Sequence, residues 1–228
     1  MTDTRTRGDA SQNVDDALSF DGPYLGTPEP APKPVCGTLP YSEEISGQSF
    51  SLRRLRADSI SKSYLEWLND PEVIRFLQVR FEPRDYASAK HFVESFDHEN
   101  SFIFGIYANG ADDYIGNITL SANPHHLFAN MGYLIGDKRF WRTDAALEAV
   151  RLVCDFAFFE RGLRKIFELT TANHIASNFN FRRLGFSYEG KVPDLYWGDG
   201  KYQAATIWTM SAREWAKIRH YPVENVTP

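Results

Sequence analysis

Several polar side chains stand where they could take part in chemistry. Asn117 lies between Gly116 and Ile118 in a strand-like stretch. Asparagine is a poor strand former, so its amide could orient a small molecule. His125 and His126 carry imidazoles that titrate near neutral pH and could accept a proton. Neither has cysteine or carboxylate partners at metal-ligand spacing, so we expect surface loop histidines and no metal site.

Glu148 and the two cysteines are further candidates. Glu148 falls in the first turn of a predicted helix, where it either acts in catalysis or only interacts favourably with the helix dipole. Cys36 and Cys154 lie far apart without framework spacing, which is typical of reduced thiols in a cytosolic protein. Cys154 stands beside the apolar side of the same helix, so we expect a buried structural thiol.

Aromatic residues surround a predicted hairpin turn at Asp199-Gly200. They are Tyr196, Trp197 and Tyr202. Aromatic side chains at such a turn can stack on a sugar ring, or they can simply pack against one another.

The elements that must position these residues follow from hydrophobic periodicity. The pattern predicts helices over residues 59–69, 84–96, 146–157 and 175–184, and strands over residues 50–55, 102–108, 114–120, 130–135, 166–170, 186–191 and 203–210. Gly162 and Gly185 are natural helix stops, and residues 109–113 suit a hairpin turn. This order predicts a mixed α/β domain: two helices, a meander, then helices laid over a sheet.

The first part of the chain has a different composition. Six of the twelve prolines fall between Pro23 and Pro40, and such a stretch stays extended without a core of its own. We therefore expect a flexible acidic Pro-rich tail over residues 1–46, a folded domain over 47–217 and a C-terminal tail over 218–228. The alternative for the first segment is a docking peptide for a partner, anchored by Tyr24 and Leu25.

Composition argues against two kinds of partner. No apolar run approaches the roughly 18 residues of a membrane-spanning helix, and no secretory signal is visible, so we expect a cytoplasmic protein that does not enter membranes. The net charge of −5 arises in residues 1–46, where eight acidic residues face three basic ones; the remainder balances at 22 of each. A neutral body with scattered basic residues argues against nucleic acid as the partner.

An ordered set of motifs carries a family resemblance. The motifs are Tyr64–Val73 (YLEWLNDPEV), Ile115–Ile118 (IGNI), Gly132–Gly136 (GYLIG), Glu148-Ala149, Asn173 with Ser177, Leu184–Phe186 (LGF) and Glu189-Gly190. From about Ser51 to Trp215 the chain resembles the GNAT acyltransferases, in the branch of the ribosomal-protein N-acetyltransferases. It looks closest to relatives that acylate amino sugars. The resemblance implies an α/β GNAT fold: a mixed, mostly antiparallel sheet flanked by helices.

The resemblance also implies a reaction and a set of site residues. The reaction is transfer of an acyl group from a coenzyme A thioester, with acetyl-CoA as co-substrate, to an amine without a metal. The protein must hold the thioester against a neutral amine, supply backbone N–H groups for the oxyanion and accept the amine's proton. The strand matching Tyr133, Leu134 and Ile135 is expected to bind the pantetheine arm. Asn117, Asn173, Ser177 and Glu148 are the catalytic candidates, and Asn173 could also hold the pantetheine.

The expected pyrophosphate loop departs from the family pattern. Coenzyme A pyrophosphate sits at the N-terminus of the long helix, where relatives read Trp-Gly-Lys-Gly-Tyr-Ala. Here the six positions read Trp141, Arg142, Thr143, Asp144, Ala145 and Ala146. Asp144 could cap the helix, which would fill the anion site and repel phosphate; Thr143 could cap instead. Arg142, with Lys138 and Arg139, could pair with a phosphate or form an ordinary solvated charged segment.

A second departure concerns the acid that protonates the leaving thiolate. Many relatives have tyrosine four residues before the glycine of the LGF turn, whereas this chain has Phe181. Ser177 and Asn173 are then the remaining polar candidates near the sulfur.

Three functions follow from these observations. The leading one is an N-acyltransferase that acts on a small amine, such as an amino sugar attached to a nucleotide. The second keeps acyl transfer but takes the donor from an acyl carrier protein, which would face the basic residues 138, 139 and 142. The third is a non-catalytic GNAT-fold binding module. A homodimer is expected from the fold.

Overall fold

The computed structural model describes residues 43–226. Cys36 and the proposed anchors Tyr24 and Leu25 lie outside the described residues. The strands are β1 Glu44–Ser46, β2 Phe50–Arg54, β3 Ser101–Ala108, β4 Asp113–Asn123, β5 Phe128–Ile135, β6 Lys165–Thr171, β7 Ser187–Gly198 and β8 Lys201–Ser211. The helices are α1 Lys62–Leu68, α2 Tyr86–Glu94, α3 Ala145–Asp155 with a π-helical end Phe156–Glu160, α4 Ile175–Arg183 and α5 Ala212–Ile218. Short 3₁₀ turns are Ala57–Ser59, Gln78–Phe81, Lys138–Phe140 and Val223–Asn225.

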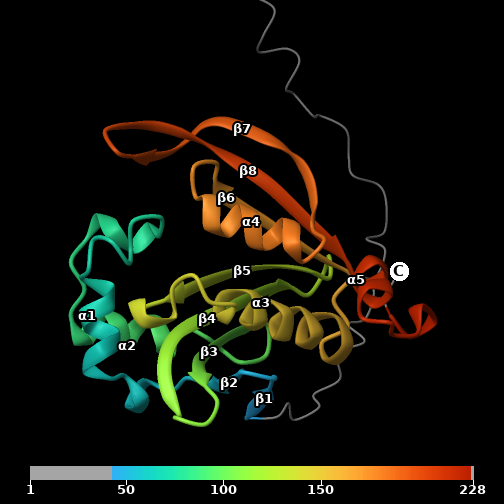
Figure 1. The fold of residues 1–228 in the computed structure, drawn as a ribbon, viewed down its shortest axis with the longest axis horizontal. Coiled ribbons are helices and arrows are strands. Elements are labelled where there is room, and N and C mark those ends of the chain that lie inside the picture. Colours follow the sequence, from blue (N-terminus) through green and yellow to red (C-terminus); the bar gives the residue numbers. More distant parts are fainter. Residues whose placement is uncertain (1–42, 227–228) are drawn as a thin grey trace, which may run out of the picture. The chain divides into compact units, whose positions relative to one another are not determined.

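The strands form one sheet in the order β1-β2-β3-β4-β5-β6-β8-β7 (Figure 1). Every neighbouring pair is antiparallel except β5 and β6, which run parallel. A parallel pair needs a crossover, and here α3 provides it between β5 and β6. The predicted α/β class with a mixed, mostly antiparallel sheet is confirmed.

Two cores lie on opposite faces of the sheet. Strand residues alternate between faces, so Phe102 and Phe104 enter the larger core with α3, α4 and α5. Ile103 enters the smaller core under α1 and α2. On α3, Val150 and Val153 are fully buried, and each such side chain stabilises the fold by about 1.5–3 kcal/mol.

The helices begin where side chains can cap them. Ser61 Oγ accepts a hydrogen bond from the Tyr64 N–H at 3.1 Å at the start of α1. At α2, Asp85 and Ser88 form a reciprocal capping box, which satisfies two amides that the helix itself leaves unpaired. These caps fix the two helices that cover the face of the sheet carrying Ile103 and Leu134.

Several elements extend beyond the ranges that periodicity predicts. Residues 44–46, inside the predicted tail, form β1 and pair with β2. Strand β7 continues past residue 191 to Gly198 through two irregularities in its pairing with β8. Within the predicted C-terminal tail, the Tyr221 ring stacks on Phe159 with 4.2 Å between centroids, and Val226 is buried. Such short segments carry too few residues for a periodic signal.

Residues 71–81, here called the strap, join α1 to the region before α2 and contact the far half of the sheet. Arg75 Nη2 lies 3.0 Å from Asp199 Oδ2 at the tip of the β7–β8 hairpin, and an Arg80 Nη2–H donates to the Trp197 carbonyl. Phe76 stacks on His174, before α4, with 4.1 Å between ring centroids. The strap therefore connects the β6–β8 side of the molecule with the side that carries α1 and α2.

Candidate functional site

The central feature is a splay between the parallel strands β5 and β6. They pair only at Phe128 with Lys165 and at Ala129 with Ile166. One step beyond, the Met131 N–H donates to the carboxylate of Glu168 instead of to a β6 carbonyl. Burial raises the pKa of Glu168 well above its usual range, and the Met131 hydrogen bond opposes this shift. The side chain of Glu168 thus takes the place of the next backbone hydrogen bond between β5 and β6.

Beyond Met131, one edge of β5 faces the splay. Backbone groups of alternate strand residues point to the same edge, so the N–H and C=O of Tyr133 share the edge of Met131. The Ile135 carbonyl on this edge accepts a hydrogen bond from Trp141 Nε1 at 2.8 Å. An extended ligand could pair with Tyr133 here as a strand would.

The predicted pyrophosphate loop keeps the backbone form that glycine favours. Arg142 has φ of 64°, in the left-handed region that only glycine adopts without cost. Thr143 Oγ1 donates to the Phe140 carbonyl at 2.6 Å and accepts from the Ala145 N–H at 3.3 Å. Of the two capping alternatives, Thr143 therefore makes the side-chain contact, while Asp144 makes no capping hydrogen bond.

Asp144 is turned toward α4. Its carboxylate lies 2.8 Å from Arg183 Nη1, so it does not occupy the first-turn amides of α3. Ala146, two residues later in that turn, is only partly buried. Apart from the Ala145 N–H, which donates to Thr143 Oγ1, the N-terminus of α3 is therefore not filled by a side chain of this loop, and of the two alternatives the structure has the Thr143 cap.

The three predicted basic residues do not act together. Lys138 pairs with Asp70 at 2.8 Å and with Glu72 at 2.6 Å. Arg139 pairs with Asp137 at 2.6 Å and also with Asp113. Arg142 is exposed and forms no ion pair with a described residue, so it is the one cation of the three that remains available to a phosphate.

Tyr133 presents a hydroxyl to α4 from the edge of the splay. Burial raises the pKa of this hydroxyl, and hydrogen bonding with Ser177 and Asn180 lowers it. A phenol with a raised pKa is protonated at neutral pH. Phe181, the family's acid position, is buried and packs on Phe186 with 5.0 Å between centroids. A tyrosine from the strand and the predicted Ser177 are therefore the hydroxyl groups brought together here.

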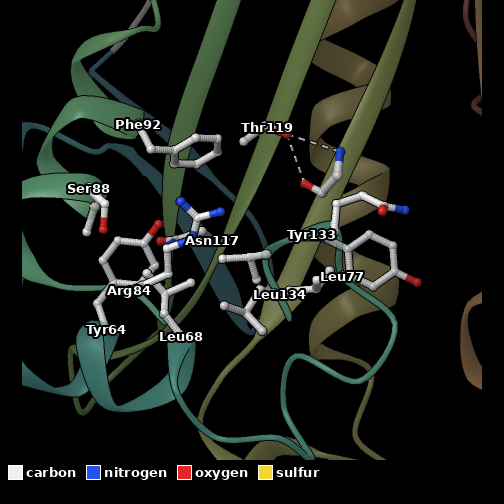
Figure 2. Close-up of a pocket in the computed structure, with 14 residues that line it drawn as sticks. Tyr64, Leu68, Leu77, Arg84, Ser88, Phe92, Asn117, Thr119, Tyr133 and Leu134 are labelled. Carbon is white, nitrogen blue, oxygen red and sulfur yellow. Dashed lines mark hydrogen bonds between the residues drawn. The ribbon is translucent and has the colours of Figure 1, made fainter. Parts of the chain in front are cut away.

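A pocket of about 370 Å³ opens on the other side of β5, between α1, α2, the strap and β4. Its lining is mostly apolar: Leu68, Leu77, Val79, Ala89, Phe92 and Leu134. Figure 2 shows Tyr133 directed away from the group formed by Tyr64, Arg84 and Asn117. Leu134 faces the pocket, while its neighbour Tyr133 reaches the splay, so the two spaces meet across this short stretch of β5.

Asn117 stands at the pocket wall and is held by two tyrosines. Its Oδ1 accepts a hydrogen bond from the Tyr114 hydroxyl, and Asn117 is 5% exposed. Burial raises the pKa of Tyr64 to about 12, while a hydrogen bond with Asn117 and the nearby Arg84 charge lower it. The amide is therefore fixed in a definite orientation beside the pocket.

The other predicted catalytic candidates are Glu148 and Asn173. Glu148 is buried and accepts hydrogen bonds from the N–H groups of Ser49, at 2.9 Å, and Phe50, at 3.4 Å; it joins α3 to the start of β2. Asn173 is exposed after β6. Its backbone carbonyl accepts from the Ile175 N–H at 2.9 Å.

The predicted loop histidines and the helix cysteine are where the sequence indicates. His125 and His126 are exposed in the β4–β5 loop, at the end of β4 away from Asn117. Cys154 is free and buried on α3, as expected. In the part of the chain that the structure describes, no group of three His, Cys, Asp or Glu side chains is arranged to hold a metal.

Sequence reasoning missed four site residues: Glu168, Arg84, Arg183 and Asn178. Asn178 Oδ1 accepts from Thr206 Oγ1 at 2.6 Å and from Trp208 Nε1 at 2.9 Å, which ties α4 to β8. In the sequence alone, these charged or polar residues on helices and loops cannot be distinguished from solvent-exposed ones. For Glu168 the sequence pattern pointed the other way, because its neighbours Phe167 and Leu169 are apolar, yet both are exposed and Glu168 is buried.

No helix within residues 43–226 is long and apolar enough to cross a membrane.

Comparisons with known proteins agree with this geometry. Residues 50–187 match the family model described as acetyltransferase (GNAT) domain. No curated protein matches the chain. Among solved structures, a probable acetyltransferase of the GNAT family from Chromobacterium violaceum ATCC 12472 aligns with a TM-score of 0.66 and 22% identity, covering 83% of this chain and 96% of that one.

Two further structures are of ribosomal-protein acetyltransferases. A ribosomal L7/L12 alpha-N-protein acetyltransferase in complex with coenzyme A aligns with a TM-score of 0.65 and 16% identity, covering 74% of this chain and 98% of its own. A ribosomal-protein-S5-alanine acetyltransferase from Vibrio fischeri aligns with a TM-score of 0.62 and 17% identity, covering 75% and 98%. At these identities the likeness shows the fold, and the family model spans well over half of the chain. The protein therefore has the GNAT fold and belongs to the GNAT acetyltransferase family of enzymes.

Proposed function

We propose that this enzyme transfers an acetyl group from acetyl-CoA to a small primary amine. The observation that carries the proposal is the meeting of two spaces at β5: an unpaired strand edge at Tyr133 and an apolar pocket at Leu134. The strand edge suits an extended thioester arm. The pocket suits a compact acceptor, because pockets of a few hundred Å³ hold small ligands.

The described residues fit coenzyme A. Arg142 keeps the backbone conformation of a phosphate-binding glycine, Asp144 leaves the first-turn amides of α3 open, and the helix dipole favours an anion there. Tyr133 N–H and C=O would pair with the pantetheine amides. When bound, acetyl-CoA supplies an activated carbonyl whose bond to sulfur is broken as the bond to nitrogen forms.

The chain's own residues then orient the acceptor and move protons. Asn117 and the pocket walls hold the amine toward β5. The protonated Tyr133 hydroxyl donates its proton to the departing sulfur and is re-protonated from solvent. The lining contains neither a carboxylate nor an imidazole, so the amine enters neutral, and the proton that its nitrogen releases as the amide forms passes to water.

The acceptor class has two candidates. A nucleotide-linked amino sugar is the predicted one, and the exposed rings of Trp197 and Tyr202 at the β7–β8 tip are suited to stacking. The apolar lining around Phe92 and Leu134 favours instead an amine with an apolar body, because sugar hydroxyls buried there would lose hydrogen bonds.

Titration calorimetry with acetyl-CoA, followed by mass spectrometry of an amine panel, tests the proposal. We expect micromolar binding that Ala146→Glu abolishes, because a carboxylate then fills the first turn of α3. The same change at exposed Ala87, in the first turn of α2, should leave binding intact. Turnover of an acyl-carrier-protein thioester without turnover of acetyl-CoA would identify the carrier protein as the acyl donor. No binding and no turnover of either thioester would leave a non-catalytic module and refute the proposal.

A further inference from the structure

The pocket carries an unbalanced positive charge. Among its lining residues Arg84 is charged, and none is acidic. In Figure 2 the guanidinium of Arg84 points into the space between Phe92 and the pair Tyr64 and Asn117. Placing a cation in a mostly apolar pocket costs free energy unless an anion accompanies it. The pocket is therefore electrostatically suited to a ligand with a negative charge.

Within residues 43–226, no acidic side chain lies closer to Arg84 than 3.9 Å. The nearest ion-pair contact of Arg84 is Glu82, with 3.9 Å between Nη2 and Oε2, and the Glu82 side chain is 76% exposed. Such a surface contact is weak and screened by salt. Arg84 Nε is buried and has no hydrogen-bond partner among the described residues. A planar guanidinium with open donors is suited to bidentate binding of a carboxylate or a phosphate.

The backbone of Arg84 is held in place from outside the pocket. Asn69 Nδ2 donates to the Arg84 carbonyl at 2.7 Å, and the Arg84 N–H donates to Asn69 Oδ1 at 3.1 Å. This two-point contact fixes the residue directly before the Asp85 cap of α2. A charged side chain on a pinned backbone loses less freedom when it binds a ligand than one on a mobile loop.

We infer that the acceptor amine bears an anionic group, a carboxylate or a phosphate, which Arg84 binds while the amine faces β5. This inference rests on the proposed function, and it makes Arg84 a specificity-determining residue. It follows that acceptors with a second cationic group, such as polyamines, are rejected by the like charge, and neutral amines of the same size are poor substrates.

The test compares matched amines. The panel contains aliphatic amino carboxylates of different chain lengths, the corresponding amino phosphates, a nucleotide-linked amino sugar, the neutral amines without the anion, and spermidine. We expect kcat/KM for an anionic amine to exceed that of its neutral counterpart by about 10- to 100-fold, and Arg84→Gln to remove this preference. Arg84→Lys should retain part of it. Lys90→Gln, which removes a charge from exposed α2 outside the pocket, should not affect it.

Calorimetric binding of the same amines in the presence of coenzyme A gives a readout that does not depend on turnover. Preference for carboxylates or for phosphates identifies the anion, and either result supports the inference. Equal turnover and binding of neutral and anionic amines, or a preference that survives Arg84→Gln, would overturn it while leaving acetyl transfer intact. If no amine is acetylated, the proposed function fails; binding of anionic amines that Arg84→Gln removes would still support the site.

Discussion

The Asp144–Arg183 pair makes a sharp prediction about coenzyme A binding. The two side chains are 64% and 42% exposed, so the pair itself contributes at most about 1 kcal/mol to folding. Its larger effect is on the anion site, because it keeps a carboxylate away from the amides of α3. Arg183→Ala releases Asp144, which can then cap the helix.

The magnitude follows from the contacts that phosphate would have to displace. A capping carboxylate stabilises a helix start by about 1 kcal/mol, and a negative charge in the first turn interacts with the dipole by about 0.3–1 kcal/mol. Together they oppose phosphate by about 1–2 kcal/mol, which weakens acetyl-CoA binding roughly 5- to 30-fold. Asp144→Asn added to Arg183→Ala removes the competing charge and should restore most of the affinity.

Titration calorimetry of the four proteins, the parent, both single variants and the double variant, measures this cycle. Arg182→Ala is the matched control, because Arg182 is exposed on the same turn of α4. Thermal unfolding should show changes within about 1 kcal/mol for all variants. If Arg183→Ala lowers the affinity and Asp144→Asn does not restore it, Arg183 contacts the ligand itself. That result would refute the argument that Arg183 acts by holding the Asp144 carboxylate away from the amides of α3.

Three further predictions concern single side chains. Tyr133→Phe should lower kcat by about 10²-fold with little change in KM, because the leaving sulfur loses its proton donor; steady-state kinetics measures this. Asn178→Ala should destabilise the fold by about 1–3 kcal/mol in chemical denaturation, because the buried Trp208 N–H loses its shorter hydrogen bond. Glu168 has a raised pKa in the folded state, so its contribution to stability is present below about pH 4.3 and is lost as pH rises through the folded pKa. Glu168→Gln should therefore gain stability relative to the parent as pH rises above the unfolded-state pKa of glutamate.

Each of these predictions has its own control. Tyr188→Phe, at a half-exposed position on β7, should leave kcat unchanged, and an equal loss in both tyrosine variants would contradict the proton-donor role. Asn130→Ala, at an exposed position on β5, removes the same group without the Trp208 contact, so equal destabilisation would argue against the network. A stability difference between Glu168→Gln and the parent that does not change with pH would show that Glu168 does not titrate as its burial implies.

The helices and strands that position the site could largely be predicted from periodicity. Long segments with a repeating apolar side, such as the one containing Val150 and Val153, show which face they bury regardless of what packs on them. The three-residue strand β1 was not predicted, because a strand so short has no detectable hydrophobic period.

The site itself depended on pairs of residues that are distant in the chain. Asp144 and Arg183 are 39 positions apart, and local reasoning assigned Asp144 to the nearest amides because it could not supply a competing cation. Arg84 was not a candidate in the sequence, because its place in the pocket wall depends on how α2 packs against β4 and β5. Tyr133 was predicted on the donor strand, but its role as a hydroxyl facing Ser177 depended on the packing of α4.

The splay has a consequence for how the protein holds itself together. Within the sheet the two portions are joined by two residue pairs and the Glu168 carboxyl, and the strap adds contacts outside it, so few hydrogen bonds cross this seam. An extended ligand that pairs with Tyr133 adds a strand to this seam. Under the proposed function, acetyl-CoA would be a structural part of the sheet as well as the acyl donor, and amide exchange along β5 and β6 should slow together when it binds. We then expect the enzyme to be most rigid when loaded and to return to a looser state when product leaves.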